Sequence, residues 1–397
     1  MSKRCFIAFL GCFIAVLSFA QAESDERAML ELHDGVTISK DSIFLLNIRF
    51  RMQNRAGFTT VDGEDLSTAA WDVRVRRLRL RFDGFALNRK WQYYIQLAFS
   101  KSDLDLEESE IAQPIRDAIV HYRFNKWTQL SFGQSKLPGN RQRVVSSGNL
   151  QFPDRSLVNT RFTLDRDFGL FFYRTLPMGN MRVNLKTAIT SGDGRNASPI
   201  DEGLAYTGRV EWLPLGEFTK GGDFSEGDLE REAKPKLSLA AGYSTNRNAR
   251  RVGGQLGEAL FAPRNINTLT VDMVLKYKGW ALSSEFMDRT SEEDPLTTSV
   301  DGDVEYVYEG SGVNTQLSYC TPTRWEIVSR YTLVQPGKRI GSLTPITEEI
   351  QVGGNKYFKG HRIKAQLIAG YRWTEGIADT DHAGNRWNAM FQLEFGI

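Results

Sequence analysis

Strict alternation of apolar and polar residues recurs along most of the chain, and this pattern constrains the fold more than any other feature. Side chains on a β-strand point to opposite faces with a period of two. In the segment WDVRVRRLRLRFDGF (residues 71–85), one face carries Arg77, Arg79 and Arg81 and the other carries Leu78, Leu80 and Phe82. The phase of the alternation shifts at Arg76, which indicates either a β-bulge or the start of the strand. The sequence therefore predicts a strand with one apolar face and one face of arginines.

Other segments repeat this alternation along the chain. It is clear in residues 44–52, 90–100, 116–125, 181–190, 268–278, 361–373 and 387–395. Weaker candidates are residues 128–136, 167–175, 205–212, 236–244, 280–289, 312–319, 324–333 and 349–358. With residues 77–85 these make roughly sixteen segments of about ten residues, the length of a tilted membrane-spanning strand.

The connections between these segments alternate between short and long. Short ones fall at residues 84–89, 125–126, 177–180, 278–279, 321–323 and 359–360, and carry the Gly, Pro and Asn of tight turns. Long polar ones fall at residues 54–71, 101–115, 137–166, 191–204, 245–266, 290–311, 334–348 and 374–385. The predicted fold is therefore all-β: a transmembrane antiparallel β-barrel of about 16 strands, with short periplasmic turns and long external loops. One acidic connection, residues 213–235, is long where a short turn is expected, and indicates either a missed pair of strands or a periplasmic excursion.

The N-terminus indicates export. Residues 1–22 combine Lys3 and Arg4, an apolar run, and a small-x-small ending, as in a cleaved signal peptide. The alternative, a membrane anchor, needs roughly 20 apolar residues, and this run is shorter. We expect residues 23–40 to form a short periplasmic segment and residues 41–397 to form the barrel. Cleavage would leave Cys320 as the only cysteine, so no internal disulfide is expected. The expected location is the outer membrane of a Gram-negative-type bacterium.

The tryptophans are consistent with a membrane-spanning barrel. Such barrels carry aromatic girdles at both membrane interfaces. All eight tryptophans lie at ends of the predicted segments: Trp71, Trp91, Trp127, Trp212, Trp280, Trp325, Trp373 and Trp387. Aromatic residues also end strands in soluble sheets, so this observation supports the barrel without requiring it.

The arginine face must point away from lipid. An arginine at the lipid midplane costs roughly 2–4 kcal/mol, so three in one strand are expected to face the lumen. Fixed guanidinium groups in a narrow channel attract anions, and their geometry suits phosphate and carboxylate oxygens. Arg49 and Arg51 on the preceding segment are expected to extend the positive surface. In the alternative interpretation, lumen acids such as Asp83, Asp117 and Glu211 pair with these arginines, which then stabilise the barrel wall and do not take part in anion transport.

Several stretches of the sequence resemble sequences of the phosphate-selective porin O and P family. They are VRRLRLRFDG, FGQSKLPGNRQRVVSSGNLQFPDRSLVNTRFTLDRDFGLFF, AITSGDGRN and WLPLGEF. The resemblance covers most of the mature chain and implies a trimeric outer-membrane porin of 16 strands. It also implies that the third external loop, residues 137–166, folds inward and narrows the pore. The terminal Ile397 departs from the aromatic residue with which such chains usually end.

The predicted function is passive diffusion of small anionic solutes, phosphate or polyphosphate among them. Two alternatives remain: a general, weakly selective diffusion porin, and a structural or adhesin barrel without transport. No enzyme activity, cofactor, metal site or nucleic-acid partner is predicted, since the four histidines lack metal-ligand spacing and the net charge is only +2. The expected partners are small anions, outer-membrane lipid and two further copies of the chain. The candidate residues for lining the pore and binding anions are Arg49, Arg51, Arg77, Arg79, Arg81, Arg141, Arg143, Arg155, Arg161 and Arg166.

Overall fold

The computed structural model describes residues 29–32, 35–101, 113–197, 203–375 and 384–397. The predicted signal peptide, residues 1–22, lies outside the described residues.

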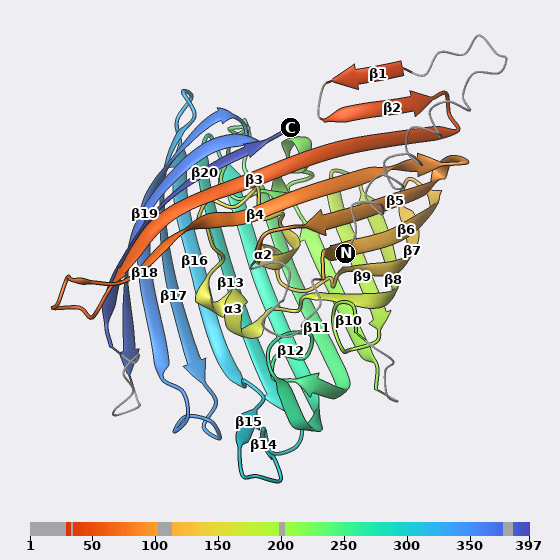
Figure 1. The fold of residues 1–397 in the computed structure, drawn as a ribbon. Coiled ribbons are helices and arrows are strands. Elements are labelled where there is room, and N and C mark those ends of the chain that lie inside the picture. Colours follow the sequence, from red (N-terminus) through yellow and green to blue (C-terminus); the bar gives the residue numbers. More distant parts are fainter. Residues whose placement is uncertain (1–28, 33–34, 102–112, 198–202, 376–383) are drawn as a thin grey trace, which may run out of the picture.

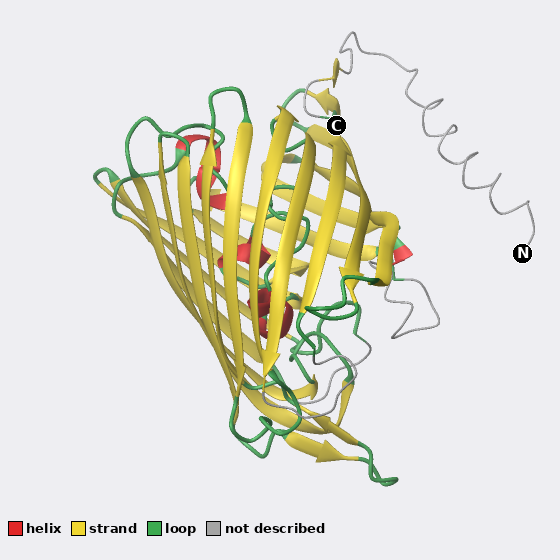
Figure 2. Cartoon of the chain, turned by 90° about the vertical axis from the view of Figure 1, so that its left-hand side faces the viewer, coloured by secondary structure: helices red, strands yellow, loops and turns green. Residues whose placement is uncertain are grey.

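Sixteen antiparallel strands close into one barrel (Figure 1 and Figure 2), which confirms the predicted fold class. Each strand pairs with its neighbour in sequence, and the last strand pairs with the first to close the wall. The wall consists of β3 (Phe44–Thr60), β4 (Thr68–Ala86), β5 (Asn88–Ala98), β6 (Ile115–Asn125), β7 (Thr128–Lys136), β8 (Arg166–Met178), β9 (Met181–Thr190), β10 (Ala205–Leu213), β11 (Lys236–Arg251), β12 (Ala259–Tyr277), β13 (Trp280–Ser291), β16 (Gly310–Cys320), β17 (Trp325–Pro336), β18 (Ile346–Lys359), β19 (Ile363–Glu375) and β20 (Arg386–Gly396).

A hairpin precedes the barrel. It consists of β1 (Met29–Leu32) and β2 (Val36–Lys40), and β2 pairs with the first five residues of β3. Further along, β3 pairs instead with β20, from Arg51 to Thr59. Part of the predicted N-terminal segment, residues 23–40, thus extends the sheet beyond the barrel seam, as Figure 1 shows above the start of β3.

Short turns gather at one end of the barrel, here named the inner end, and long loops gather at the other, the outer end. At the inner end the turn between β12 and β13 is made by Lys278 and Gly279, whose φ angles of 48° and 95° fit a type I′ hairpin turn. Several predicted long loops are shorter than expected. The loop between β3 and β4 is residues 61–67, because both strands continue beyond the stretch in which apolar and polar residues alternate.

The long connection between β10 and β11 contains no additional pair of strands. Residues 214–235, here named the inward turn, hold the short 3-10 helix η2 (Thr219–Phe224). Of the two interpretations that the sequence allows, a missed strand pair is therefore wrong. Three of the segment's six acidic side chains, Asp223, Asp228 and Glu232, are buried.

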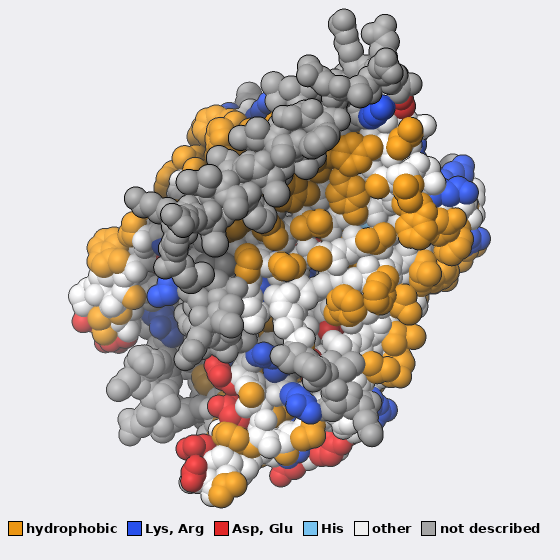
Figure 3. All heavy atoms as spheres, turned by 45° about the vertical axis from the view of Figure 1, so that its right-hand side comes forward, with side chains coloured by type: hydrophobic (Ala, Val, Ile, Leu, Met, Phe, Trp, Pro, Cys, Tyr) orange, Lys and Arg blue, Asp and Glu red, His pale blue; other side chains and the backbone are white. Residues whose placement is uncertain are grey.

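The outer wall is apolar. Figure 3 shows hydrophobic side chains spread over the wall, with charged side chains towards the ends. Seven of the eight tryptophans are exposed, as expected for aromatic residues that face the membrane interfaces. Among the described residues, no helix is long and apolar enough to cross a bilayer.

The phase shift at Arg76 is a β-bulge. Gln53 of β3 pairs with Arg77 of β4, but the next residue, Asn54, pairs with Val75, so Arg76 is the extra residue. A bulge adds one residue to one strand and reverses the facing of the residues beyond it. Val73 and Val75 are therefore 69% and 46% exposed on the outer wall.

Candidate functional site

The strands β3 and β4 bring the two arginine rows side by side. Arg49 lies directly opposite Arg81, and Arg51 lies directly opposite Arg79. The alternate positions of the same register pair Phe50 with Leu80 and Met52 with Leu78. Like charges directly opposite each other destabilise a strand pair, so these rows need compensating groups or bound anions.

Asp83 compensates the arginines nearest the inner end. Arg49 Nη2 donates to Asp83 at 3.0 Å, and Arg81 Nε lies 2.8 Å from the same carboxylate. The Arg81 guanidinium also lies over the ring of Tyr94, 4.6 Å from its centroid. One carboxylate thus serves two guanidinium groups, which leaves this pair with a net positive charge.

The other two acids named as possible braces are also paired. Arg166 donates two bonds to Asp117, at 2.9 and 3.0 Å. Glu211 accepts from Arg209 at 2.8 Å and lies 2.7 Å from Lys186. Arg81 and Arg166, together with Arg49, are therefore partly braced by acids of the wall.

Residues 137–165, here named the inward loop, leave the outer end of β7 and cross the lumen before entering β8. The loop carries α2 (Arg141–Val144) and α3 (Leu157–Phe162), and both helices lie inside the ring of strands (Figure 1 and Figure 2). Ser156 caps α3, because its hydroxyl accepts from the Asn159 amide. Ser147 reaches the arginine rows: its Oγ accepts from Arg51 at 2.7 Å and from Arg79 at 3.1 Å.

The opposite side of the barrel anchors the inward loop. Arg141 Nε donates to Asp272 at 2.9 Å, and the Gln142 amide donates to Glu285 at 2.6 Å. Lys364 Nζ donates to two loop carbonyls, those of Gly148 and Leu150. Apolar contacts add to these bonds: Val158 and Phe162 of α3 pack with Met287, Tyr308 and Val334. The loop therefore fills the lumen against β12, β13 and β16 to β19.

Three cavities remain beside the arginine rows. An outer cavity of about 530 Å³ opens among the outer ends of β3, β4 and β20, and an inner cavity of about 260 Å³ lies among their inner ends. Between them lies a middle cavity of about 200 Å³. Arg76, Arg77, Arg143 and Arg155 line both the outer and middle cavities, and Arg79 lines both the middle and inner ones. Guanidinium groups thus run from one end of the lumen to the other.

The middle cavity is strongly positive. Among the described residues, its lining holds one carboxylate, Asp165, against nine cations: Arg76, Arg77, Arg79, Arg116, Lys136, Arg143, Arg155, Arg166 and Arg195. Burial lowers the pKa of Arg155 to about 9, and the nearby Arg79 adds to this effect. Burial and its arginine neighbours likewise hold the pKa of Arg143 well below its usual range. Cations that lower one another's proton affinity create a potential that attracts anions.

Eight of the ten candidate arginines line these three cavities. Arg49, Arg51 and Arg81 line the inner cavity, Arg79 the inner and middle ones, Arg77, Arg143 and Arg155 the middle and outer ones, and Arg166 the middle one. The other two lie elsewhere. Arg141 is buried against Asp272, and Arg161 lies over the ring of Tyr308.

Sequence reasoning missed three arginines of the middle cavity, Arg76, Arg116 and Arg195, the first two because bulges place them there. Arg76 is the extra residue opposite Gln53 and Asn54, and Arg116 is the extra residue where β6 shifts its register against β5. Strict alternation assigns neither of them reliably to the lumen. Arg55, in the outer cavity, follows the alternation of Arg49 and Arg51, and was missed because residues 54–71 read as a loop.

Asp154 of the inward loop is one of the acids that pair with arginines of the outer cavity. It lies 2.7 Å from Arg55 Nη1 and 3.5 Å from Arg76 Nε. Although burial raises the pKa of Asp154, these guanidinium groups hold it well below its usual range. The loop backbone has its own anchor here, since Arg330 donates to the Asp154 carbonyl at 2.9 Å.

We expect Asp154→Asn to raise the ratio of anion to cation permeability, because it removes a negative charge beside the route and keeps the side chain's shape. Reversal potentials across a planar bilayer in a salt gradient measure this ratio. Asp65→Asn in the exposed loop 61–67 is the control, and should leave the ratio unchanged. A lower ratio for Asp154→Asn would mean that the carboxylate mainly holds the arginines in place.

Within the described ranges, no three His, Cys, Asp or Glu side chains are placed to hold a metal ion. The arrangement is instead suited to conduction: an apolar outer wall, a lumen reduced by an inward loop, and fixed charges beside the remaining space. Outer-membrane porins pass small solutes through barrels of this kind, and the protein is an outer-membrane porin. The chain belongs to the phosphate-selective porin O and P family, whose sequence model matches residues 46–395. The family and the fold are those of channels.

Solved porin structures share the fold at low sequence identity. An anion-selective porin from Comamonas acidovorans superposes with a TM-score of 0.60 at 10% identity, covering 89% of this chain and 100% of that one. OmpF of Salmonella typhi, in complex with daunomycin, gives 0.57 at 13% identity, covering 93% and 100%. OmpT of Vibrio cholerae, in its trimer form, gives 0.54 at 9% identity, covering 89% and 100%. No curated protein sequence matches the chain significantly.

Proposed function

We propose that this porin gives passive diffusion of small anionic solutes along the arginine rows of β3 and β4. The excess of cations in the middle cavity carries the proposal. Screening in physiological salt limits the field of a charge to about 8 Å, so fixed charges govern transport only where the path is narrow. A cavity of about 200 Å³ keeps any solute within that distance of its lining.

Inorganic phosphate is the solute that we propose to test first. Guanidinium groups bind phosphate oxygens through paired, charge-assisted hydrogen bonds. The family is named for phosphate selectivity, and the neighbour from Comamonas acidovorans is named an anion-selective porin. A weakly selective diffusion porin is the second candidate, and the pairing of Arg49 and Arg81 with Asp83 favours it.

The assembly and the maturation are also proposals. We propose a homotrimer in the outer membrane, supported by the trimer form of the OmpT neighbour. We further propose that residues 1–22 direct export and are removed, and that residues 41–397 act as the barrel domain, with its loop 137–166 as the element that narrows the pore.

Planar-bilayer recording tests the proposed function. We expect the purified porin to show discrete conductance steps and a reversal potential with the sign of anion preference. Added inorganic phosphate should reduce the chloride current, because both anions use the same guanidinium groups. Cation preference would overturn the anion route. Anion preference without any phosphate effect would favour the weakly selective porin, and a barrel without conductance would favour the structural or adhesin role.

A further inference from the structure

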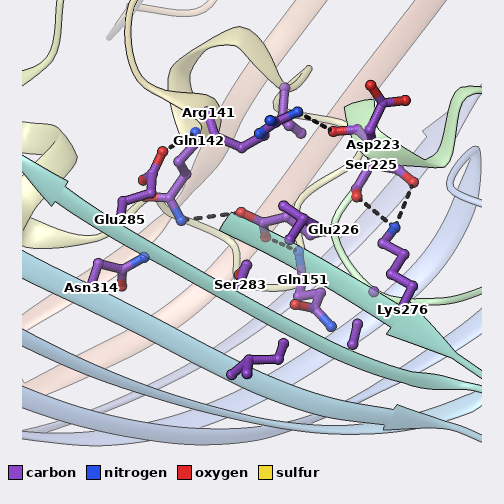
Figure 4. A pocket seen from close by; sticks show the side chains of 15 residues that line it. Arg141, Gln142, Gln151, Asp223, Ser225, Glu226, Lys276, Ser283, Glu285 and Asn314 are labelled. Atoms are coloured by element: carbon purple, nitrogen blue, oxygen red, sulfur yellow. Dashed lines mark hydrogen bonds between the residues drawn. The ribbon is translucent and has the colours of Figure 1, made fainter. Parts of the chain in front are cut away.

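The inward turn enters the lumen from the inner end and meets the inward loop there. Figure 4 shows the junction: Arg141, Gln142 and Gln151 of the loop face Asp223 and Glu226 of the turn. The Glu226 carboxylate accepts a hydrogen bond from the side-chain Nε2 of Gln142 at 3.1 Å and one from the backbone N–H of Gln151 at 2.7 Å. One side chain of the turn therefore holds two parts of the loop that are nine residues apart in sequence.

Backbone groups strengthen the same junction. The Glu226 amide donates to the Asn149 carbonyl at 2.9 Å, and Asn149 Nδ2 donates to the Phe224 carbonyl at 3.3 Å. Arg141 Nη1 donates to the Asp223 carbonyl at 3.2 Å. The turn and the loop are thus joined along their contact and can act as one body.

The barrel wall holds the turn in this position. Lys276 Nζ donates to the carbonyls of Gly222 and Ser225, at 2.6 and 2.9 Å. The Gly279 amide donates to Asp228 at 2.7 Å. Phe218 packs with Leu213 and Val274. Polar and apolar contacts of this kind resist displacement of the turn towards the inner opening.

We propose that the inward turn is a strut that holds the inward loop in the half of the lumen bounded by β10 to β13, β16 and β17, with Glu226 as the positioning residue, so that the two segments together close that half. The strut confines solutes to the arginine rows. It acts on selectivity because the wall that it covers is not predominantly positive. The buried, inward-facing charged side chains of that wall are balanced: Arg209, Lys276, Arg289 and Arg330 against Glu211, Asp272, Glu285 and Glu326.

Removal of the strut should therefore open a second route without anion preference. Trp212 lies opposite Leu239, so β10 and β11 can be joined by a short hairpin turn in place of residues 214–235. We expect this variant to conduct up to roughly twofold more, since the inward loop loses its support and the open cross-section grows by as much as the closed half. Its ratio of anion to cation permeability should fall towards that of an uncharged pore. This last expectation rests on the proposed anion route, whereas the rise in conductance does not.

Point variants keep the test informative if the shortened barrel fails to assemble. Glu226→Ala removes both side-chain contacts with the loop and should raise conductance and current noise while lowering the anion preference. Glu226→Gln keeps one acceptor oxygen and should show a smaller change in the same direction. The control is Lys220→Ala with Glu230→Ala, an ion pair on the exposed part of the same turn, which should leave conductance unchanged.

The outcomes separate this inference from the proposed function. Unchanged conductance in assembled Glu226→Ala and shortened-turn barrels would overturn the strut, whatever the selectivity of the wild type. A wild type that prefers cations would overturn the anion route, while higher conductance in the variants would still support the strut. A rise in conductance with undiminished anion preference would contradict the role of the strut in selectivity.

Discussion

Exchange of Arg79 for glutamine is expected to lower the ratio of anion to cation permeability about fivefold. A unit charge about 8 Å from the passing ion, at a dielectric constant near 80 as in bulk water, contributes roughly 0.5 kcal/mol, with opposite sign for an anion and a cation, so the two effects together change the ratio by about that factor. Arg79 lines both the middle and inner cavities, and its Nη1 bonds a neutral hydroxyl, that of Ser147. It is therefore the one of the three arginines on this face of β4 that lies where the middle and inner cavities meet.

The neighbouring arginines should matter less. Arg81 is paired with Asp83, so its removal leaves that carboxylate to Arg49. Arg77 Nη1 donates to Gln53 at 2.8 Å, and its Nη2 lies 3.8 Å from Asp154. We expect the effect on permeability to decrease from Arg79→Gln to Arg77→Gln to Arg81→Gln.

Reversal potentials of the three single variants, and of a variant in which Arg77, Arg79 and Arg81 are all changed to alanine, test this order. The surface change Arg123→Gln at the inner end of β6 is the control, because Arg123 is exposed and lines none of the three cavities described above. Equal effects for all three positions would contradict the argument from the position of Arg79 and from the pairing of Arg77 and Arg81 with acids. Anion preference that survives the triple change would move its origin to Arg143 and Arg155 of the inward loop.

Removal of the inward loop is expected to raise the single-channel conductance roughly threefold or more, since the obstruction between the cavities would disappear. Lys136 and Arg166 are register partners at the ends of β7 and β8, so a short turn can replace residues 137–165. Anion preference should fall in the same variant, because Arg143 and Arg155 are lost and the pore becomes wider than the screening length.

A matched deletion at the outer end controls for nonspecific damage to the loops. The hairpin of β14 (Leu296–Thr298) and β15 (Val304–Tyr306) ends in a tip where Val300 is fully exposed. Removal of residues 300–302 should leave conductance unchanged. An assembled barrel that lacks residues 137–165 and conducts like the wild type would contradict the expected narrowing.

The wall of the barrel was predictable because its determinants are local. Whether a residue faces lipid or lumen follows from the two-residue period of a strand, as in Leu78 and Arg79. Tight turns such as Lys278–Gly279 follow from the backbone freedom of single residues. The closed barrel of sixteen strands is therefore confirmed, with errors mainly where strands such as β4 and β12 extend past the alternating stretch.

The lumen was predictable only in part. Which charges meet across the barrel depends on register and bulges, and two one-residue bulges, one in β4 and one in β6, bring Arg76 and Arg116 into the middle cavity. The pairing of Arg141 with Asp272 joins residues 131 positions apart, and no short-range pattern records such a contact. The sequence therefore could not separate Arg141 from Arg143, although one is bound to the far wall and the other faces the middle cavity.

The class of fold, the approximate positions of the strands and the arginine row on β4 could all be predicted from the amino-acid sequence. These depend on side chains that are close along the chain and on the contrast between lipid and water. The division of the lumen could not be predicted in this way, because it rests on hydrogen bonds between residues that are far apart in the sequence. The contact of Glu226 with Gln142 and Gln151 is the clearest case. The acidic connection between β10 and β11, for which the sequence allowed two interpretations, enters the barrel because partners from the inward loop and from β12 satisfy its buried polar groups.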